Sequence, residues 1–268
     1  MKILAIVCPV IRHQYTFNVL AEKIPFAGVI KQHKVRKCVS REMTQEEEDA
    51  NKKHFMLRDE AEERWLGEIG RELNTDRETK VLEIHSNTLD IQEVDEFIDS
   101  ISPDVIITLG SGLVKKEVLD KIQYGLNFHL GMSPRYRGGA GFFWPIYNMD
   151  PERIGASILV LEDNIDGGSI VHHSRPDISV GDSLHDIAAK TIIKGAKEYS
   201  EILHALFDGH ELIAIPQKSA GRVHYEAAYH PRHLVVADFL MSSGVIENYL
   251  GSKEERDKYV YLVKFPQL

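Results

Sequence analysis

Cysteine is scarce in this sequence: Cys8 and Cys38 are the two cysteines among 268 residues. They do not form a C-x-x-C pair, and two thiols cannot supply a disulfide framework or a zinc knuckle. Reduced thiols are typical of proteins in a reducing compartment. We therefore expect two reduced, buried cysteines in a cytoplasmic protein without a metal site.

Positive charge is also in short supply. The chain has 32 lysines and arginines against 41 aspartates and glutamates, which gives a net charge of −9. General binders of nucleic acid or anionic membranes carry a basic surface instead. The apolar start of the chain stops at Pro9 and is too short for a membrane span. The expected partners therefore include neither nucleic acid nor a membrane.

Three common catalytic fingerprints are missing from the sequence. It contains no G-x-G-x-x-G after the first apolar run, no G-x-x-x-x-G-K-[ST] and no G-x-S-x-G. Their absence argues against a dinucleotide-dependent dehydrogenase, a P-loop enzyme and an α/β-hydrolase, in that order.

Short apolar runs alternate with helical patterns over the first two thirds of the chain. This alternation predicts an α/β fold with a doubly wound, mostly parallel sheet, whose ligands bind beyond the carboxyl ends of the strands. The expected strands are 2–10, 26–31, 80–85, 103–110, 124–130 and 154–162, and the expected helices are 14–23, 91–100 and 115–122.

Two segments depart from this rhythm. We assign residues 1–208 to a catalytic domain with a helical insertion at 42–75, and 209–268 to a small C-terminal α+β extension that ends in a strand at 258–265. The insertion is rich in charge but has an apolar stripe, which favours a long helix or helical hairpin packed on the main domain. A homodimer contact or a lid over the site are the alternatives.

The stretch "GLNFHLGMSPRYRGG" (125–139) contains an unusual strand end. Side chains alternate between the two faces of a strand, so Leu126 and Phe128 point one way while Asn127 and His129 point the other. One face is apolar packing, and the other presents an amide beside an imidazole. A third polar residue, Asp166, follows the predicted strand at 154–162, in "LEDNIDGGSIV" (161–171). Taken singly, each of these residues has an ordinary structural explanation.

Taken together, residues 102–171 resemble the formyltransferases that use 10-formyltetrahydrofolate. That family includes glycinamide ribonucleotide transformylase, methionyl-tRNA formyltransferase and the sugar N-formyltransferases. Its pattern is an Asn-x-His at a strand end, a Pro-containing loop that ends in Arg-Gly, and a later Ile-Asp-x-Gly. The matching residues here are Asn127, His129, Pro134, Arg137, Gly138 and Asp166.

The resemblance implies a Rossmann-like formyltransferase fold and a catalytic trio. A neutral amide such as that of Asn127 can hydrogen-bond the oxyanion of a tetrahedral intermediate. His129 would carry a proton, because imidazole titrates near neutral pH. Asp166 would orient the imidazole, raise its proton affinity or hold a bridging water. The formyl donor would be 10-formyltetrahydrofolate, with no metal.

The resemblance also implies two binding regions. The pterin ring of the donor would lie against Leu109, Gly110, Ser111, Gly112 and Leu113 together with Glu162, Asp163 and Ile165. The two glycines could equally serve only to turn the chain. The acceptor would contact Arg12, His13, Pro134 and Arg137. Arg137 could instead be an ordinary surface arginine.

The loop after His129 bears on the acceptor. The family commonly has Pro-Ser-Leu-Leu-Pro here, whereas this chain has Leu-Gly-Met-Ser-Pro (130–134), so no role passes to Gly131. This variant looks closest to the sugar N-formyltransferases, which implies a nucleotide-linked amino sugar as the amine acceptor. Methionyl-tRNA formyltransferase normally has a longer C-terminal domain and basic surfaces, and glycinamide ribonucleotide transformylase is shorter. A folate- or nucleotide-binding module without activity is the alternative from another class.

Overall fold

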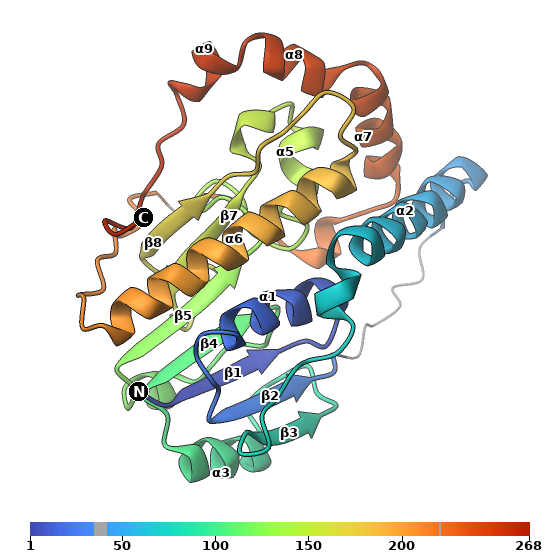
Figure 1. Ribbon diagram of the computed structural model, residues 1–268. Helices are drawn as coiled ribbons and strands as arrows, with labels where there is room; N and C mark the ends of the chain where they lie inside the picture. Colours follow the sequence, from blue (N-terminus) through green and yellow to red (C-terminus); the bar gives the residue numbers. More distant parts are fainter. Residues whose placement is uncertain (35–41, 220) are drawn as a thin grey trace.

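The computed structural model describes residues 1–34, 42–219 and 221–268, and within these ranges a seven-stranded sheet forms the centre of the molecule (Figure 1). The strand order is β3-β2-β1-β4-β5-β7-β8. The first five strands in this order are parallel, while β7 runs antiparallel to both of its neighbours. The predicted doubly wound, mostly parallel sheet is therefore confirmed. The strands are β1 (Ile3–Val7), β2 (Gly28–Gln32), β3 (Lys80–Ile84), β4 (Val105–Leu109), β5 (Tyr124–His129), β7 (Ala156–Val160) and β8 (Ile170–Ser174).

The central strands are buried along their whole length. Every residue of β1 and β4 is buried, as the continuous apolar runs in both segments require of a sheet covered on two faces. The edge strand β3 is largely exposed and carries charged side chains, which discourage pairing with another chain.

Helices cover both faces of the sheet. On one face, α1 (Ile11–Ala21) and α6 (Leu184–Phe207) share an apolar core with β1, β4 and β5. On the other, α3 (Gln92–Ile101) packs against β1, β2 and β4, beside the short α4 (Lys116–Leu119). Helix α4 is shorter than predicted because the chain turns at Gln123, whose N–H donates to the Asp104 carbonyl at 2.8 Å as β5 begins.

The insertion forms one long helix rather than a hairpin. Helix α2 (Gln45–Gly70) begins in a capping box in which Thr44 and Glu47 satisfy each other's backbone N–H groups. It packs against α1, α6 and a helix of the extension, and its buried residues include Ala61 and Leu66.

The C-terminal extension contains more helix than predicted. It includes the short strand β9 (Val223–His224), which pairs with β6 (Arg137–Gly138) in the loop after β5, and then α7 (Arg232–Ser242), α8 (Val245–Gly251) and α9 (Lys253–Asp257). The imidazole of His224 stacks on Trp144 of α5 (Phe143–Tyr147), with ring centroids 4.6 Å apart.

The predicted final strand at 258–265 is wrong. This segment lies beside β8 but forms no ladder with it. The N–H groups of Val263 and Phe265 donate to ring nitrogens of His173 and His172, at 3.0 and 3.1 Å, instead of to backbone carbonyls. Imidazoles of β8 thus take the place of the strand's hydrogen-bond acceptors.

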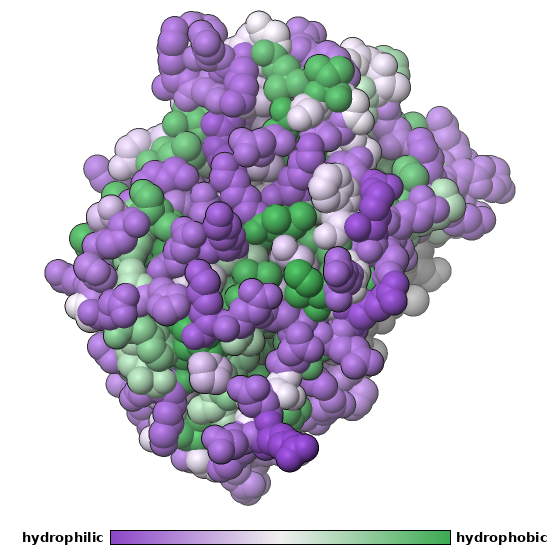
Figure 2. Space-filling model, in the orientation of Figure 1, coloured by the Kyte–Doolittle hydropathy of each residue, from purple (hydrophilic) through white to green (hydrophobic). Residues whose placement is uncertain are grey.

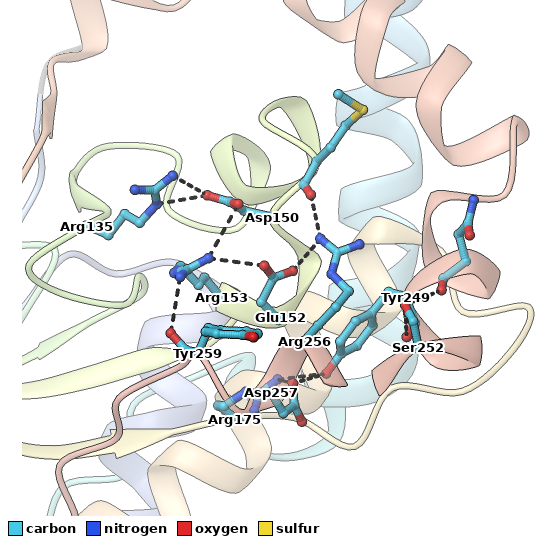
Figure 3. A network of polar contacts seen from close by, with 12 residues as sticks. Arg135, Asp150, Glu152, Arg153, Arg175, Tyr249, Ser252, Arg256, Asp257 and Tyr259 are labelled. Atoms are coloured by element: carbon cyan, nitrogen blue, oxygen red, sulfur yellow. Dashed lines mark hydrogen bonds and ion pairs between the residues drawn. The ribbon is translucent and has the colours of Figure 1, made fainter. Parts of the chain in front are cut away.

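An ion-pair network fastens the last helices to the rest of the chain (Figure 3). Glu152, whose side chain is 9% exposed, accepts from Arg153 at 3.1 Å and from Arg256 at 2.6 Å. Arg175, which follows β8, donates to Tyr249 and Asp257 at 2.7 and 2.8 Å. Buried charges are tolerated when they are paired in this way.

The surface is polar over most of the face shown in Figure 2, with apolar side chains in separate small groups. Among the residues that the structure describes, no helix is long and apolar enough to cross a membrane.

Candidate active site

Strand β5 positions the first two candidate residues. Leu126 and Phe128 lie in the apolar core, and Asn127 and His129 occupy the opposite face, as the alternation predicts. Thr108 on β4 is paired with Asn127 in the sheet, and its hydroxyl donates to Asn127 Oδ1 at 3.0 Å. This bond fixes the amide so that its nitrogen is presented to the site.

Asp166 is the hub of the site. Its Oδ1 accepts from Asn127 Nδ2 at 2.9 Å, and its Oδ2 accepts from the Gly138 N–H at 2.8 Å and lies 3.3 Å from His129 Nδ1. Both His129 and Asp166 are largely buried, with 6% and 13% of their side chains exposed. The three residues of the predicted catalytic trio therefore meet at one point, although 39 positions separate Asn127 from Asp166.

The imidazole of His129 is held from both sides. Its Nε2 lies 2.7 Å from the Tyr136 carbonyl, which can only accept, so Nε2 carries a hydrogen. Its Nδ1 faces the Asp166 carboxylate, which is also an acceptor when ionised. This second contact is satisfied when one proton lies between the two groups.

The loop after β5 wraps closely around this ring. A Cβ on Gly131 would lie 2.6 Å from both His129 Nε2 and the Tyr136 carbonyl, so glycine is needed there. The Ser133–Pro134 peptide bond is cis. From β7, Ser157 Oγ donates to the Gly131 carbonyl at 2.7 Å and accepts from the Ser133 N–H at 3.0 Å. The Leu-Gly-Met-Ser-Pro loop thus has a shape that a serine at position 131 would not allow.

A tight turn presents Asp166. Its φ is 45°, an unusual value for a residue other than glycine. A Cβ on Gly168 would lie 1.8 Å from the Val160 backbone carbonyl, whereas one on Gly167 would meet only the movable side chains of Asn164 and Arg137. The second glycine of the Asp-Gly-Gly sequence is therefore a steric requirement of this turn.

Arg137 reaches the same turn. Its Nε donates to the Ile165 carbonyl at 2.9 Å, and a terminal nitrogen lies 3.3 Å from Asn164 Oδ1. The structure thus directs this guanidinium toward the Asp166 turn. Its predicted contact with the acceptor stays a prediction.

The other predicted acceptor residues are partly enclosed. Arg12 forms an ion pair with Glu62 of α2 at 2.7 Å. His13 is buried, with Nδ1 3.1 Å from the Cys8 carbonyl, and its ring lies where a Cβ on Gly110 would be. Burial, and then the nearby charge of Arg12, lower the pKa of His13 well below its usual value. His13 is therefore a neutral ring beneath the loop that follows β4.

The predicted pterin-binding loop is anchored by two residues that sequence reasoning missed. Gln32, fully buried at the end of β2, accepts from the Gly112 N–H at 2.7 Å, and Lys34 Nζ donates to the Ser111 carbonyl at 2.7 Å. A glutamine ending an apolar strand was the signal available for the first. Burial lowers the pKa of Lys34.

Two of the residues predicted to contact the pterin ring are exposed apolar side chains. Leu113 is 54% exposed and Ile165 is 37% exposed, whereas Leu109 is buried within β4. Glu162 and Asp163 are exposed on the loop after β7, where Glu162 accepts from Asn164 Nδ2 at 3.2 Å. The roles of these residues in donor binding stay predictions.

A cavity borders the segment between β9 and α7. A Cβ on Gly139 would lie 3.3 Å from Cγ of Glu226, and the residues after Glu226 border a cavity of about 630 Å³. Its lining consists of two histidines, one arginine, one glutamate and two alanines: His230, His233, Arg232, Glu42, Ala227 and Ala228. Within the described ranges, no group of three or more His, Cys, Asp or Glu side chains is placed to hold a metal ion. Cys8 is a free, half-buried thiol, and Cys38 lies outside the described residues.

Comparison with known proteins agrees with this geometry. A family described as formyl transferase matches residues 27–203. A methionyl-tRNA formyltransferase from Clostridioides difficile is 28% identical over 161 residues, which are 57% of this chain and 50% of that protein. The chain spans half or less of the length of the curated relatives it matches.

Solved structures of formyltransferases have the same fold. A sugar N-formyltransferase from a Shewanella species superposes with a TM-score of 0.54 at 13% identity, covering 85% of this chain and 78% of that one. A phosphoribosylglycinamide formyltransferase from Anaplasma phagocytophilum gives a TM-score of 0.53 at 10% identity, covering 84% and 98%. At these identities the likeness concerns the fold alone.

Proposed function

This chain belongs to the formyl transferase family, whose members transfer formyl groups with 10-formyltetrahydrofolate as the donor, and we propose that it transfers a formyl group from that donor to the primary amine of a nucleotide-linked amino sugar. One observation carries the proposal: the side chains of Asn127 and His129 both contact the carboxylate of Asp166. An amide donor and a proton carrier side by side are what formyl transfer to an amine needs.

Asn127 would stabilise the tetrahedral intermediate. When the acceptor nitrogen bonds to the formyl carbon, the carbonyl electrons move onto oxygen. One amide hydrogen of Asn127 goes to Asp166, and no described residue accepts the second, which is available for this oxyanion. Collapse of the intermediate reforms the carbonyl and breaks the bond between the formyl carbon and N10 of the folate.

His129 and Asp166 would balance the protons. N10 needs a proton as it leaves, and the acceptor nitrogen must lose one. The proton between Nδ1 and the carboxylate, 3.3 Å apart, can be delivered to N10 and replaced from the acceptor nitrogen. Asp166, with 13% of its side chain exposed against 6% for His129, is the more exposed member of the pair.

Two features support an anionic small-molecule acceptor. The cavity that borders residues 227–233 has His230, His233 and Arg232 in its lining, which suit the phosphates of a nucleotide sugar. The net charge of −9 is unfavourable for binding a tRNA, whose affinity depends on basic contacts with phosphates.

The test is a transfer assay with a panel of acceptors. The purified protein is mixed with 10-formyltetrahydrofolate and nucleotide-linked amino sugars, glycinamide ribonucleotide or methionyl-tRNA, and each acceptor is analysed by mass spectrometry for a gained formyl group. We expect a formylated amino sugar, formed far more slowly by a His129→Asn variant. Formylation of another acceptor in the panel alone would overturn the substrate class.

A thermal-shift measurement separates an enzyme from a binding module. A folate analogue at about 100 times its Kd should stabilise the protein by about 2.7 kcal/mol. Stabilisation by the analogue without transfer to any acceptor would contradict the enzymatic proposal and favour a folate-binding module.

A further inference from the structure

The segment that joins α6 to α7 runs along the catalytic loops. Ile215 exchanges backbone hydrogen bonds with Ile170, at the start of β8. Further on, a Cβ on Gly221 would lie 1.5 Å from the Pro134 carbonyl, so the chain passes directly against the loop after β5. Strand β9 then pairs with β6. The start of the extension therefore forms part of the wall of the site.

Gln217 stands in this segment, opposite the Asp166 turn. Its Nε2 donates to the Asp166 carbonyl and to the Gly168 carbonyl, each at 2.8 Å, so both amide hydrogens are used on one turn. On the same turn, Arg137 donates to the Ile165 carbonyl at 2.9 Å. Two side chains from different segments thus hold three carbonyls of the turn.

The turn needs such support. Asp166 has a positive φ, a backbone conformation that few residues with a Cβ adopt. Its carboxylate must nevertheless meet Asn127, His129 and the Gly138 N–H simultaneously. A misplacement of about 1 Å in a catalytic group can lower the rate about 10²-fold.

We propose that Gln217 is a positioning residue for formyl transfer: by binding the carbonyls of Asp166 and Gly168, it holds the Asp166 carboxylate where it contacts Asn127 and His129. The inference rests on the proposed function for its consequence in turnover. It also assigns a role to the C-terminal extension, which supplies this side chain to a catalytic trio whose members lie within residues 127–166.

Two substitutions at Gln217 test the hydrogen bonds separately from packing. Gln217→Met keeps the length of the side chain but removes both donors. Gln217→Glu keeps the shape but places acceptor oxygens against acceptor carbonyls. We expect both to lower kcat by about 10- to 100-fold while the KM for the acceptor changes little. Gln267→Met, the same change at an exposed glutamine near the end of the chain, should leave kcat as it is.

A second readout does not need turnover. The Gly138 N–H donates to Asp166 Oδ2, whereas the Gly139 N–H donates to the His224 carbonyl. In Gln217→Met, NMR hydrogen exchange should therefore accelerate at Gly138 and not at Gly139. Unchanged exchange at Gly138, or unchanged kcat in both variants, would overturn the inference.

The two proposals fail in different ways. If the unmodified protein transfers no formyl group to any acceptor, the proposed function is wrong, and exchange at Gly138 still decides whether Gln217 positions the carboxylate. If the unmodified protein is active and the Gln217 variants match it, the positioning role alone is wrong.

Discussion

Two buried histidines, His129 on β5 and His173 on β8, have the same contact at one of their two ring nitrogens. Each ring has its Nε2 at hydrogen-bond distance from a carbonyl of the loop after β5: that of Tyr136 at 2.7 Å for His129 and that of Ser133 at 2.9 Å for His173. In both cases the carbonyl fixes the ring plane and places a hydrogen on Nε2.

The two histidines differ at the other ring nitrogen. Nδ1 of His173 accepts from the Val263 N–H at 3.0 Å, which leaves no place for a second proton. Burial lowers the pKa of His173 to about 4, so near neutral pH it is an uncharged link between the end of the chain and the catalytic loop. Nδ1 of His129 faces the Asp166 carboxylate, which calls for a proton. The partner of Nδ1 therefore separates a structural histidine from a chemical one.

The largest effect should come from removing the chemical histidine. His129→Asn should lower kcat by about 10²–10⁴-fold, because proton transfer by a placed acid–base group accounts for that much of a rate. Steady-state formyl transfer measures it. His173→Asn is the matched control and should unfold at lower urea while the folded enzyme keeps most of its turnover. Equal losses of kcat in the two variants would contradict the assignment of His129 as the chemical histidine and His173 as the structural one.

Asn127→Ala tests the group beside His129. The loss of an oxyanion donor should lower kcat by about 10²–10³-fold with a smaller change in KM. Asn248→Ala, at an exposed position of α8, is the control for the same chemical change. A rise in KM at constant kcat would mean that Asn127 binds the ground state and not the intermediate.

His173, the structural histidine, should make the free energy of unfolding depend on pH. The pKa of His173 is about 4 in the folded chain and about 6.5 when unfolded, so as pH falls the unfolded state takes up the proton first. Its stabilising contribution is complete above about pH 6.5 and is lost toward about pH 4, a change of about 3 kcal/mol.

Urea unfolding at about pH 7 and about pH 5 measures this effect, because part of the loss already falls in that window. His173→Gln should make the free energy of unfolding less dependent on pH than it is in the unmodified chain. His224 has a pKa lowered to about 4 by burial and acts in the same direction, so some dependence should remain. If the free energy of unfolding depends on pH equally in both proteins, His173 is not the neutral link described above.

Sequence patterns were sufficient where local chemistry decides the structure. The apolar runs of β1 and β4 admit only a strand buried on both faces, and the alternation in β5 places Asn127 and His129 on one face. They failed at residues 258–265, where a strand-like run lies beside β8 but gives N–H groups to His172 and His173. No local pattern shows that a neighbouring side chain will replace a backbone acceptor.

The same limit applies to the site. The turn that carries Asp166 has a recognisable Asp-Gly-Gly sequence, and its meeting with Asn127 was predicted through the resemblance. Gln217 was not, because it lies 51 positions from Asp166 and no motif distinguishes it from other glutamines. Contacts made by a side chain to a distant backbone carbonyl depend on the complete fold, so they emerge only from the structure.

The smallest effect should come from the hydroxyl of the residue whose carbonyl holds His129. Tyr136 Oη donates to Asp150 Oδ2 at 2.7 Å, and burial raises its pKa to about 12, so it stays a donor. Tyr136→Phe should cost about 0.5–1.5 kcal/mol in urea unfolding, since Asp150 keeps Arg135 and Arg153 as partners. Turnover should hardly change, because the backbone carbonyl and not the hydroxyl fixes the imidazole. A loss of kcat close to that of His129→Asn would mean that the ring is held through the Tyr136 side chain, and the shared arrangement of the two histidines would then be misassigned.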